Sequence, residues 1–362
     1  MCCSMKERRR VRASAYLLWT AFLSAVAGKQ DVIIVADVGI DDAAGLLLAI
    51  SSPKLNVLGV ASTFGCHKDV AVTARNAERL LAAANRSDVP VFRGATNPIG
   101  STEGLARDGT FVHGADGMGD LPGKYGEECA PADHGGVSAA EFIAQSARKA
   151  PGEIVLLCFS PFTNVALALA IEPRLPWLLK AFYAMGAAVH VPGNASPLSE
   201  ANVLHDAAAA KLAVHAFTQD GACPLVLAPL DLTNPAITSP AAIDELRAKG
   251  GAAARMFADA WPVYQAAYCR LQGLCAGTPL HDAHPVAYLL APEIYTKTAS
   301  AHLHVVVASH EDEHAHGLTF VDGRGSRADQ ALPGRQPLTL LMGVDLPAFE
   351  RLLISTVLDA GV

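Results

Sequence analysis

Three carboxylates lie within six residues near the start of the chain, at Asp37, Asp41 and Asp42. The apolar run before them, residues 32–36, is β-branched and continuous, as in a parallel strand covered on both faces. Residues 43–50 are rich in alanine and leucine and indicate a helix. The acids therefore fall at the carboxyl end of a strand and in a first helical turn, where free amides favour ionised carboxylates. Such a cluster suits a hard cation; the simpler alternative is that Asp41 is a helix N-cap and the other two face water.

The rest of the chain alternates between strand and helix patterns. We predict strands at residues 56–62, 89–92, 153–159, 181–186 and 224–229, and an antiparallel hairpin from 302–307 and 318–321. We predict helices at residues 70–84, 138–150, 163–171, 206–217, 241–271, 282–290 and 346–358, with a capping box from Ser138 to Glu141. This order predicts the α/β class: a single-domain, open, mostly parallel sheet with helices on both faces, of Rossmann-like type, over residues 28–362.

Functional sites in such folds collect at the carboxyl ends of the strands. The polar residues that interrupt the apolar runs fall there: Asp37, Cys66, Ser160, residues 194–202, and His281 with Asp282. A long Gly- and Asp-rich region, residues 94–136, includes the run His-Gly-Ala-Asp-Gly-Met-Gly at 113–119. A connection of that length inside a compact domain is usually functional or disordered.

Composition limits the class of partner. The chain has 362 residues, of which 51% are hydrophobic and 17% charged, and a net charge of -7. The apolar fraction indicates a large buried interior. No basic stripe could displace counterions from phosphates, so we expect a small-molecule partner and no nucleic acid.

The first 27 residues differ from the rest. A basic segment, residues 6–12, precedes an apolar stretch, residues 13–27, that ends in Ala25-Val26-Ala27. This is the pattern of a secretory signal peptide over residues 1–27, which predicts a secreted protein or one of the endomembrane lumen. The alternatives are a mitochondrial presequence and an uncleaved membrane anchor.

Six cysteines follow this leader, without a C-x-x-C pair. Cys158 and Cys223 lie in apolar, strand-like runs and are expected to be inert core residues. Cys269 and Cys275 could pair in an oxidising compartment, which the sequence leaves open.

Several blocks together carry a family resemblance. They are Asp-Val-Gly-Ile-Asp-Asp at 37–42, Ser-Pro-Phe-Thr-Asn at 160–164, Met-Gly at 185–186, Pro-Gly-Asn at 192–194, Glu-Ala-Asn at 200–202 with Asp206, and His-Asp at 281–282. In this order they resemble the signature of the inosine-uridine preferring nucleoside hydrolase family, whose first motif reads DTDPGIDD. The resemblance runs from about Asp31 to the C-terminus.

The resemblance implies calcium-dependent hydrolysis of the N-glycosidic bond of ribonucleosides, giving free nucleobase and ribose. The calcium ligands carried over are Asp37, Asp42, Asp282 and the backbone carbonyl of Phe159. These are oxygen donors, as a hard cation prefers. Asp37 would also be the general base, acting on a water that the metal acidifies. The resemblance further implies a homodimer or homotetramer.

The resemblance also implies roles around the substrate. Asp41 and Asn202 would hold the ribose 2′-hydroxyl, and Asn194 and Glu200 the 5′-hydroxyl. Further substrate-binding residues would be Cys66, Met185, Tyr264 and Tyr268, of which the two tyrosines resemble a mobile pair that closes over the base. His281 matches a histidine placed to protonate the leaving base.

The chain also departs from the family pattern. Val35 stands where the first motif has its first aspartate, and Cys66 stands where an asparagine usually follows the second strand. The lost carboxylate removes a second-shell partner of the metal ligands, and the thiol alters one ribose contact. A catalytically impaired homologue that binds nucleoside or ribose without turnover is therefore the alternative to the enzyme.

Overall fold

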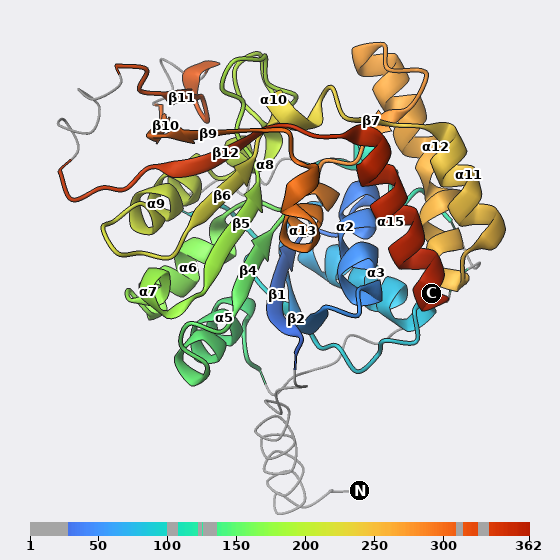
Figure 1. Cartoon of the computed structure of the whole chain (residues 1–362), viewed down its shortest axis with the longest axis horizontal. Helices are drawn as coiled ribbons and strands as arrows, with labels where there is room; N and C mark the ends of the chain where they lie inside the picture. The colour runs from blue at the N-terminus through green and yellow to red at the C-terminus, as the bar shows by residue number, and fades with distance from the viewer. Residues whose placement is uncertain (1–27, 100–107, 122–124, 126–135, 309–313, 325–332) are drawn as a thin grey trace, which may run out of the picture.

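The computed structural model describes residues 28–99, 108–121, 125, 136–308, 314–324 and 333–362. Its centre is an eight-stranded sheet in the order β3-β2-β1-β4-β5-β6-β12-β9, covered by helices on both faces (Figure 1). Neighbouring strands pair in parallel, except at the β12–β9 edge. The predicted fold class is confirmed.

The strands of the main sheet are β1 (Gln30–Ala36), β2 (Leu55–Ser62), β3 (Val91–Arg93), β4 (Val155–Cys158), β5 (Ala181–Met185), β6 (Leu225–Ala228), β9 (Lys297–Ala301) and β12 (Leu338–Gly343). Two small antiparallel pairs are β10 (Leu303–Val305) with β11 (Thr319–Val321), and β7 (Ile237–Thr238) with β8 (Thr278–Pro279). The first of these pairs is the predicted hairpin.

The helices form two layers. The layer on one face contains α2 (Ile40–Ser51), α3 (Val70–Ala83), α11 (Pro240–Lys249), α12 (Ala252–Gln272), α13 (Ala283–Leu290) and α15 (Leu346–Ala360). The other layer contains α5 (Ala139–Lys149), α6 (Thr163–Ile171) and α9 (Ala207–Phe217). Short helices in the connections are α4 (Thr110–His113), α7 (Leu175–Leu178), α8 (Ala201–His205), α10 (Leu230–Thr233) and the 3-10 turn η1 (Pro292–Ile294).

Strand β1 divides its side chains between the two layers. Val32, Ile34 and Ala36 pack into the cluster beneath α2 and α12, whereas Ile33 and Val35 pack into the cluster beneath α5 and α6. This alternation explains why the strand is apolar without interruption, because both of its faces are covered.

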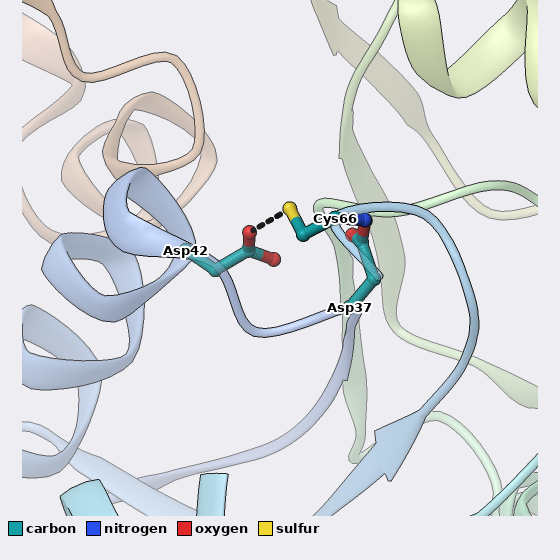
Figure 2. Close-up of side chains that lie close together, drawn as sticks. All are labelled: Asp37, Asp42 and Cys66. Atoms are coloured by element: carbon teal, nitrogen blue, oxygen red, sulfur yellow. Dashed lines mark hydrogen bonds between the residues drawn. The ribbon is translucent and has the colours of Figure 1, made fainter. Parts of the chain in front are cut away.

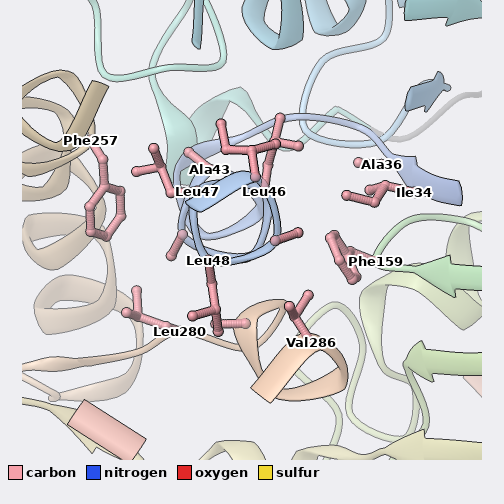
Figure 3. Packing of buried hydrophobic residues seen from close by; sticks show 14 of the residues in the cluster. Ile34, Ala36, Ala43, Leu46, Leu47, Leu48, Phe159, Phe257, Leu280 and Val286 are labelled. Atoms are coloured by element: carbon pink, nitrogen blue, oxygen red, sulfur yellow. The ribbon is translucent and has the colours of Figure 1, made fainter. Parts of the chain in front are cut away.

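Helix α2 is buried along its whole length, from Ile40 to Ser51. Figure 3 shows it nearly end-on, with Leu46, Leu47 and Leu48 directed to different sides of the helix. A helix that is apolar all round has to be surrounded by the core. The element that carries Asp41 and Asp42 is thereby held rigidly.

Helix α12 contains an interior proline, Pro262. Proline has no N–H, so the carbonyl of Ala258, four residues earlier, loses its helical partner. A guanidinium nitrogen of Arg247, from α11, donates to that carbonyl instead. Arg247 also donates to the carboxylate of Asp259, at 3.3 Å. A side chain of the neighbouring helix thus repairs the interrupted hydrogen-bond ladder of α12.

Other local predictions have mixed outcomes. The capping box is confirmed, since Ser138 N–H donates to Glu141 at 2.8 Å and Glu141 N–H donates to the Ser138 hydroxyl at 3.3 Å. The stretch 241–271, predicted as mostly helical, forms two helices, because Gly250 and Gly251 separate α11 from α12. Strands β9 and β12 were not predicted at all.

Cys269 and Cys275 form a disulfide at the C-terminal end of α12, which decides the pairing that the sequence left open. Cys158 and Cys223 are buried and free, as expected. The predicted leader, residues 1–27, lies outside the described residues. Within the described ranges, no helix has the length and apolar character needed to cross a membrane.

Candidate active site

A cavity of about 530 Å³ opens at the carboxyl ends of β1, β4 and β5. Every residue predicted for catalysis, metal binding or substrate binding lines it. These residues are Asp37, Asp41, Asp42, Cys66, Phe159, Met185, Asn194, Glu200, Asn202, Tyr264, Tyr268, His281 and Asp282. The sheet therefore gathers into one site residues that are spread over most of the sequence.

The acid end of the cavity consists of Asp37, Asp41, Asp42 and Asp282, all of them buried. Asp37 directly follows β1, Asp41 and Asp42 belong to the first turn of α2, and Asp282 immediately precedes α13. The N-cap of α2 is Gly39, whose N–H donates to the Asp42 carboxylate at 3.0 Å. The alternative of an Asp41 cap with two water-facing acids is therefore wrong.

Two glycines allow this close packing. A Cβ on Gly39 would lie 2.4 Å from the sulfur of Cys66, which no real side chain could tolerate. Gly65 has a φ of +148°, and a Cβ there would lie 2.0 Å from a carboxylate oxygen of Asp37. Each glycine leaves space for a functional side chain that approaches its backbone.

Little positive charge lies near the four aspartates to balance their negative charge. Burial is the main cause that raises the pKa of Asp37 to about 7, although hydrogen bonds from Cys66 oppose the shift. Burial, followed by repulsion from neighbouring aspartates, raises the pKa of Asp42 and Asp282 well above the ordinary value. In the part of the chain that the structure describes, no lysine or arginine lines the cavity.

The donors at this end fit a divalent cation. Ligand oxygens of Asp41, Asp42 and Asp282 all lie within 4.8 Å of one another. Oδ1 of Asp42 is buried and has no hydrogen-bond partner, so a donor atom is left for an ion. The carbonyl of Phe159 accepts from the Asn202 amide at 3.0 Å and keeps a second lone pair. An all-oxygen set of this kind matches the preference of calcium.

Cys66 lies against this acid end. Its backbone N–H donates to Asp37 at 2.5 Å, and its thiol donates to Oδ2 of Asp42 at 3.5 Å (Figure 2). Nε2 of His113 lies 3.4 Å from the sulfur, and Nδ1 of His113 accepts from the N–H of Ile40 at 3.1 Å. Because Nδ1 is the acceptor, a neutral His113 carries its proton on Nε2, directed at the sulfur. Burial lowers the pKa of His113, which favours this neutral form.

Three of the residues predicted to hold the sugar, Asn194, Glu200 and Asn202, come from the segment after β5, whereas Asp41 lies in α2. Glu200 caps α8 by accepting from the N–H groups of Asn202, at 2.8 Å, and Val203, at 3.0 Å. Asn194 accepts from the N–H of Ala201 at 2.9 Å. Burial is the main cause that raises the pKa of Glu200 to about 7. The loop is thus braced by the same side chains that face the cavity.

The aromatic end of the cavity consists of His113, Tyr264, Tyr268 and His281. The rings of Tyr264 and Tyr268 lie 4.7 Å apart on α12, and the Tyr268 hydroxyl lies 2.7 Å from Nε2 of His281. Nδ1 of His281 lies 2.6 Å from the Thr233 hydroxyl. Burial lowers the pKa of His281 to about 4. The histidine is therefore neutral near neutral pH and is held from both ring nitrogens.

His113 is the principal cavity residue that the sequence prediction missed. It ends the short helix α4, and its ring lies 5.5 Å from that of Tyr264. Phe111 and Val112 beside it, and Leu271 and Gln272 at the end of α12, also line the cavity. The run at 113–119, inside a long connection, was the available signal, but it did not indicate which strand end this segment would approach.

The departures from the family pattern have different surroundings. Val35 is fully buried in the apolar cluster beneath α5 and α6, so that position offers no polar atom to the acid end. Cys66, in contrast, contacts two of the predicted metal ligands. Only the second departure changes the chemistry inside the cavity.

Comparisons with known proteins agree with this geometry. Residues 32–351 match the family model of inosine-uridine preferring nucleoside hydrolase. The pyrimidine-specific ribonucleoside hydrolase RihA of Klebsiella pneumoniae is 33% identical over 323 residues, covering 89% of this chain and 96% of that protein. A probable uridine nucleosidase 2 of Arabidopsis thaliana is 28% identical over 340 residues, covering 93% and 100%.

The solved structure of a plant nucleoside hydrolase, PpNRh1, superposes with a TM-score of 0.79 at 25% identity, covering 91% of this chain and 98% of that one. The family, the fold and the class of enzyme, a ribonucleoside hydrolase, are thus those predicted from the sequence. The chain belongs to the inosine-uridine preferring nucleoside hydrolase family.

Proposed function

We propose that this protein is a calcium-dependent ribonucleoside hydrolase that converts a nucleoside and water into free nucleobase and ribose. One observation carries the proposal: four aspartates, the sugar-facing residues Glu200 and Asn202, and the His281–Tyr268 pair all line one cavity. Neither the ion nor the substrate depends on a single motif, since the supporting residues come from five separate segments.

Asp37, Asp42, Asp282 and the Phe159 carbonyl would hold the calcium. When bound, calcium supplies positive charge that acidifies a water and orients the ribose hydroxyls. Asp37 would accept a proton from the attacking water as the water oxygen bonds to C1′ and the C1′–N bond breaks. Without a cation, burial holds the pKa of Asp37 at about 7; a neighbouring cation would lower this pKa and keep the carboxylate ionised, as a base requires. The surrounding carboxylates stabilise the positive charge that develops on the ribose.

The departing base needs a proton, and the His281–Tyr268 pair is positioned to supply it. The two side chains are joined by a 2.7 Å hydrogen bond, and Thr233 holds the far nitrogen of the imidazole. Burial keeps His281 neutral in the resting site, so the pair must first take up a proton at Nε2 of His281; that proton would pass to the Tyr268 oxygen as the Tyr268 hydroxyl proton passes to the base. The ring of Tyr264 lies 4.7 Å from that of Tyr268, tilted by 49°, and would cover the base.

The sugar and the base are recognised by different residues. Asp41 and Asn202 are proposed to bind the 2′-hydroxyl, which favours ribose over deoxyribose, and Asn194 and Glu200 are proposed to bind the 5′-hydroxyl. For the base, the names of the bacterial and plant relatives support a pyrimidine, and we propose uridine as the first substrate to test.

The test is release of reducing sugar from uridine, cytidine, inosine, adenosine and 2′-deoxyuridine, with calcium or with a chelator. We expect chelator-sensitive release from at least one ribonucleoside and much less from 2′-deoxyuridine. Absence of chelator-sensitive sugar from all five would overturn the proposal.

A second candidate follows from the Cys66 contacts, because a thiol replaces an amide beside two metal ligands. In that case the protein binds nucleoside or ribose without turnover. Uridine would then raise the melting temperature in the presence of calcium although no sugar is released.

We further propose a homodimer or homotetramer, and entry into the secretory pathway through a cleaved leader of residues 1–27. Sedimentation and N-terminal sequencing of the mature protein test these two statements.

A further inference from the structure

The acid end contains two overlapping sets of possible metal ligands. One set has only oxygen donors, from Asp41, Asp42 and Asp282. The other has two oxygens and a sulfur, from Asp37, Asp42 and Cys66, whose ligand atoms also lie within 4.8 Å of one another. Figure 2 shows the second set, in which Cys66 and Asp42 approach from opposite sides. Because Asp42 belongs to both sets, the two sets cannot each bind an ion with all of their ligands at the same time.

The sulfur-containing set differs in chemistry from a calcium site. Hard cations such as calcium take oxygen ligands, whereas a thiolate selects softer ions such as Zn²⁺. A tetrahedral zinc with a sulfur ligand at about 2.3 Å and an oxygen ligand at about 2.0 Å places those two ligands about 3.5 Å apart. The sulfur of Cys66 lies 3.5 Å from Oδ2 of Asp42. Cys66 and Asp42 therefore need little rearrangement to hold zinc, and Asp37 offers a ligand oxygen within 4.8 Å of both.

Two further features support an ion in this place. Asp42 is 1% exposed, and its Oδ1 has no hydrogen-bond partner. His113 directs Nε2–H at the sulfur from 3.4 Å, while its other nitrogen accepts from the Ile40 N–H. An N–H donor to a metal-bound sulfur is an outer-shell contact of the type that tunes metal affinity. The sulfur thus has a neighbouring N–H donor that can orient it.

We propose that Asp37, Asp42 and Cys66 form a binding site for zinc or another thiophilic divalent cation, with His113 as the positioning residue for the sulfur. Binding displaces the thiol proton to solvent and leaves a Zn–S bond. Because Asp37 and Asp42 also belong to the proposed calcium ligands, zinc and calcium compete. If the proposed hydrolase function holds, zinc is then a reversible inhibitor; the binding site itself does not depend on that function.

The test uses the purified full chain, freed of metal, with Co²⁺ as a spectroscopic probe and Zn²⁺ as its competitor. A thiolate bound to cobalt gives a near-ultraviolet charge-transfer band that oxygen ligands do not give. We expect this band in the unmodified protein, its loss on adding zinc, and its absence in Cys66→Ser. Cys223→Ser is the matched control, because Cys66 and Cys223 are both 8% exposed.

Quantitatively, we expect Cys66→Ser to weaken zinc binding by at least about 100-fold, the upper end of what losing an outer-shell partner costs. His113→Ala should weaken it by about 10-fold. Calcium affinity should change much less in both variants. Cys66→Asn, with the residue usual in the family, replaces Cys66→Ser if that variant does not fold by circular dichroism.

Three results would overturn the inference: no cobalt binding, cobalt spectra without a charge-transfer band, or equal losses of zinc and calcium affinity in Cys66→Ser. All of these are equilibrium measurements. They therefore stand whether or not the protein hydrolyses nucleosides, and a failure of the hydrolase assay is a separate result.

Discussion

The two ends of the cavity are supported in different ways. The acid end is attached to the centre of the sheet, through β1 and the wholly buried helix α2. The aromatic end is attached to α12 and to the short helices α4 and α10, and α12 ends in the loop closed by the Cys269–Cys275 disulfide. The rigid end would hold the ion and the sugar, and the peripheral end the base. This division suggests that binding of the ion and the sugar can be altered separately from the base preference.

Removing the base at the acid end should have the largest effect. We expect Asp37→Asn to lower kcat by about 10³- to 10⁴-fold, because a general base and a metal ligand are lost together. Steady-state assays with uridine measure the loss. The control is Asp88→Asn, whose carboxylate is 49% exposed and paired with Arg86. A loss below tenfold would contradict the role of Asp37.

The next largest effect should come from the aromatic end. We expect His281→Ala to lower kcat on uridine by about 10²-fold, since it removes one member of the proposed proton-donating pair. On a riboside with a nitrophenol leaving group, which needs no proton, the loss should be much smaller. His190→Ala, at a residue whose side chain is 67% exposed, is the control. Equal losses on both substrates would refute the proton-donor role.

Opening the disulfide should affect the aromatic end alone. We expect the double variant Cys269→Ser and Cys275→Ser to lower the free energy of unfolding by about 2 kcal/mol, as for a short loop. Because Leu271 and Gln272 lie inside that loop and line the cavity, KM should rise a few-fold while calcium affinity stays the same. Denaturant titration and calcium titration measure these quantities. A fall in calcium affinity would show that the two ends are coupled.

The smallest effect concerns the acid end and pH. A pKa of about 7 for Asp37 in the folded protein, against 3.8 in model compounds, means that folding favours its protonated form. This stability is complete below pH 3.8 and is lost as the pH rises through about 7. His281 has the opposite sign: its pKa falls from 6.5 to about 4, so stability is lost only as the pH falls below 6.5.

Between pH 6.5 and about pH 8 the carboxylates therefore dominate, and we expect the calcium-free protein to lose about 1 kcal/mol of unfolding free energy per such group. Calcium should flatten this dependence, because a bound cation favours the ionised carboxylates. Urea titrations at both pH values, with and without calcium, measure it. An unchanged slope with calcium would assign the titration to Glu200, whose pKa is also about 7.

The acid end could be predicted from the sequence because most of its residues are neighbours along the chain. Asp37, Asp41 and Asp42 follow one buried strand, and the turn geometry places them together without long-range information. Asp282 and Asn202 were placed by the family resemblance and by the rule that strand ends meet at one edge of a sheet. The structure gathers all of them in the cavity.

The contacts of the aromatic end depend on packing that no local pattern specifies. His113 and Cys66 are separated by 47 positions, and the part of the connection that leads to His113, from Gly94 onward, has no periodicity that predicts its path. Strand β12 has an apolar run that the prediction overlooked, whereas strand β9 offered no such signal. Most of β9 is polar, small and partly exposed, and it becomes a strand through its pairing with β12.

Helix α12 belongs to both the core and the cavity, and Pro262 lies between these two parts. Phe257, before the proline, is fully buried in the core, whereas Tyr264 and Tyr268, after it, line the cavity. Because the usual backbone hydrogen bond across the proline is absent, the two parts of the helix can change their angle relative to each other. Arg247, which does not line the cavity, donates a hydrogen bond to the Ala258 carbonyl at this interruption. A residue outside the cavity therefore sets how firmly the two tyrosines are anchored to the rest of the molecule.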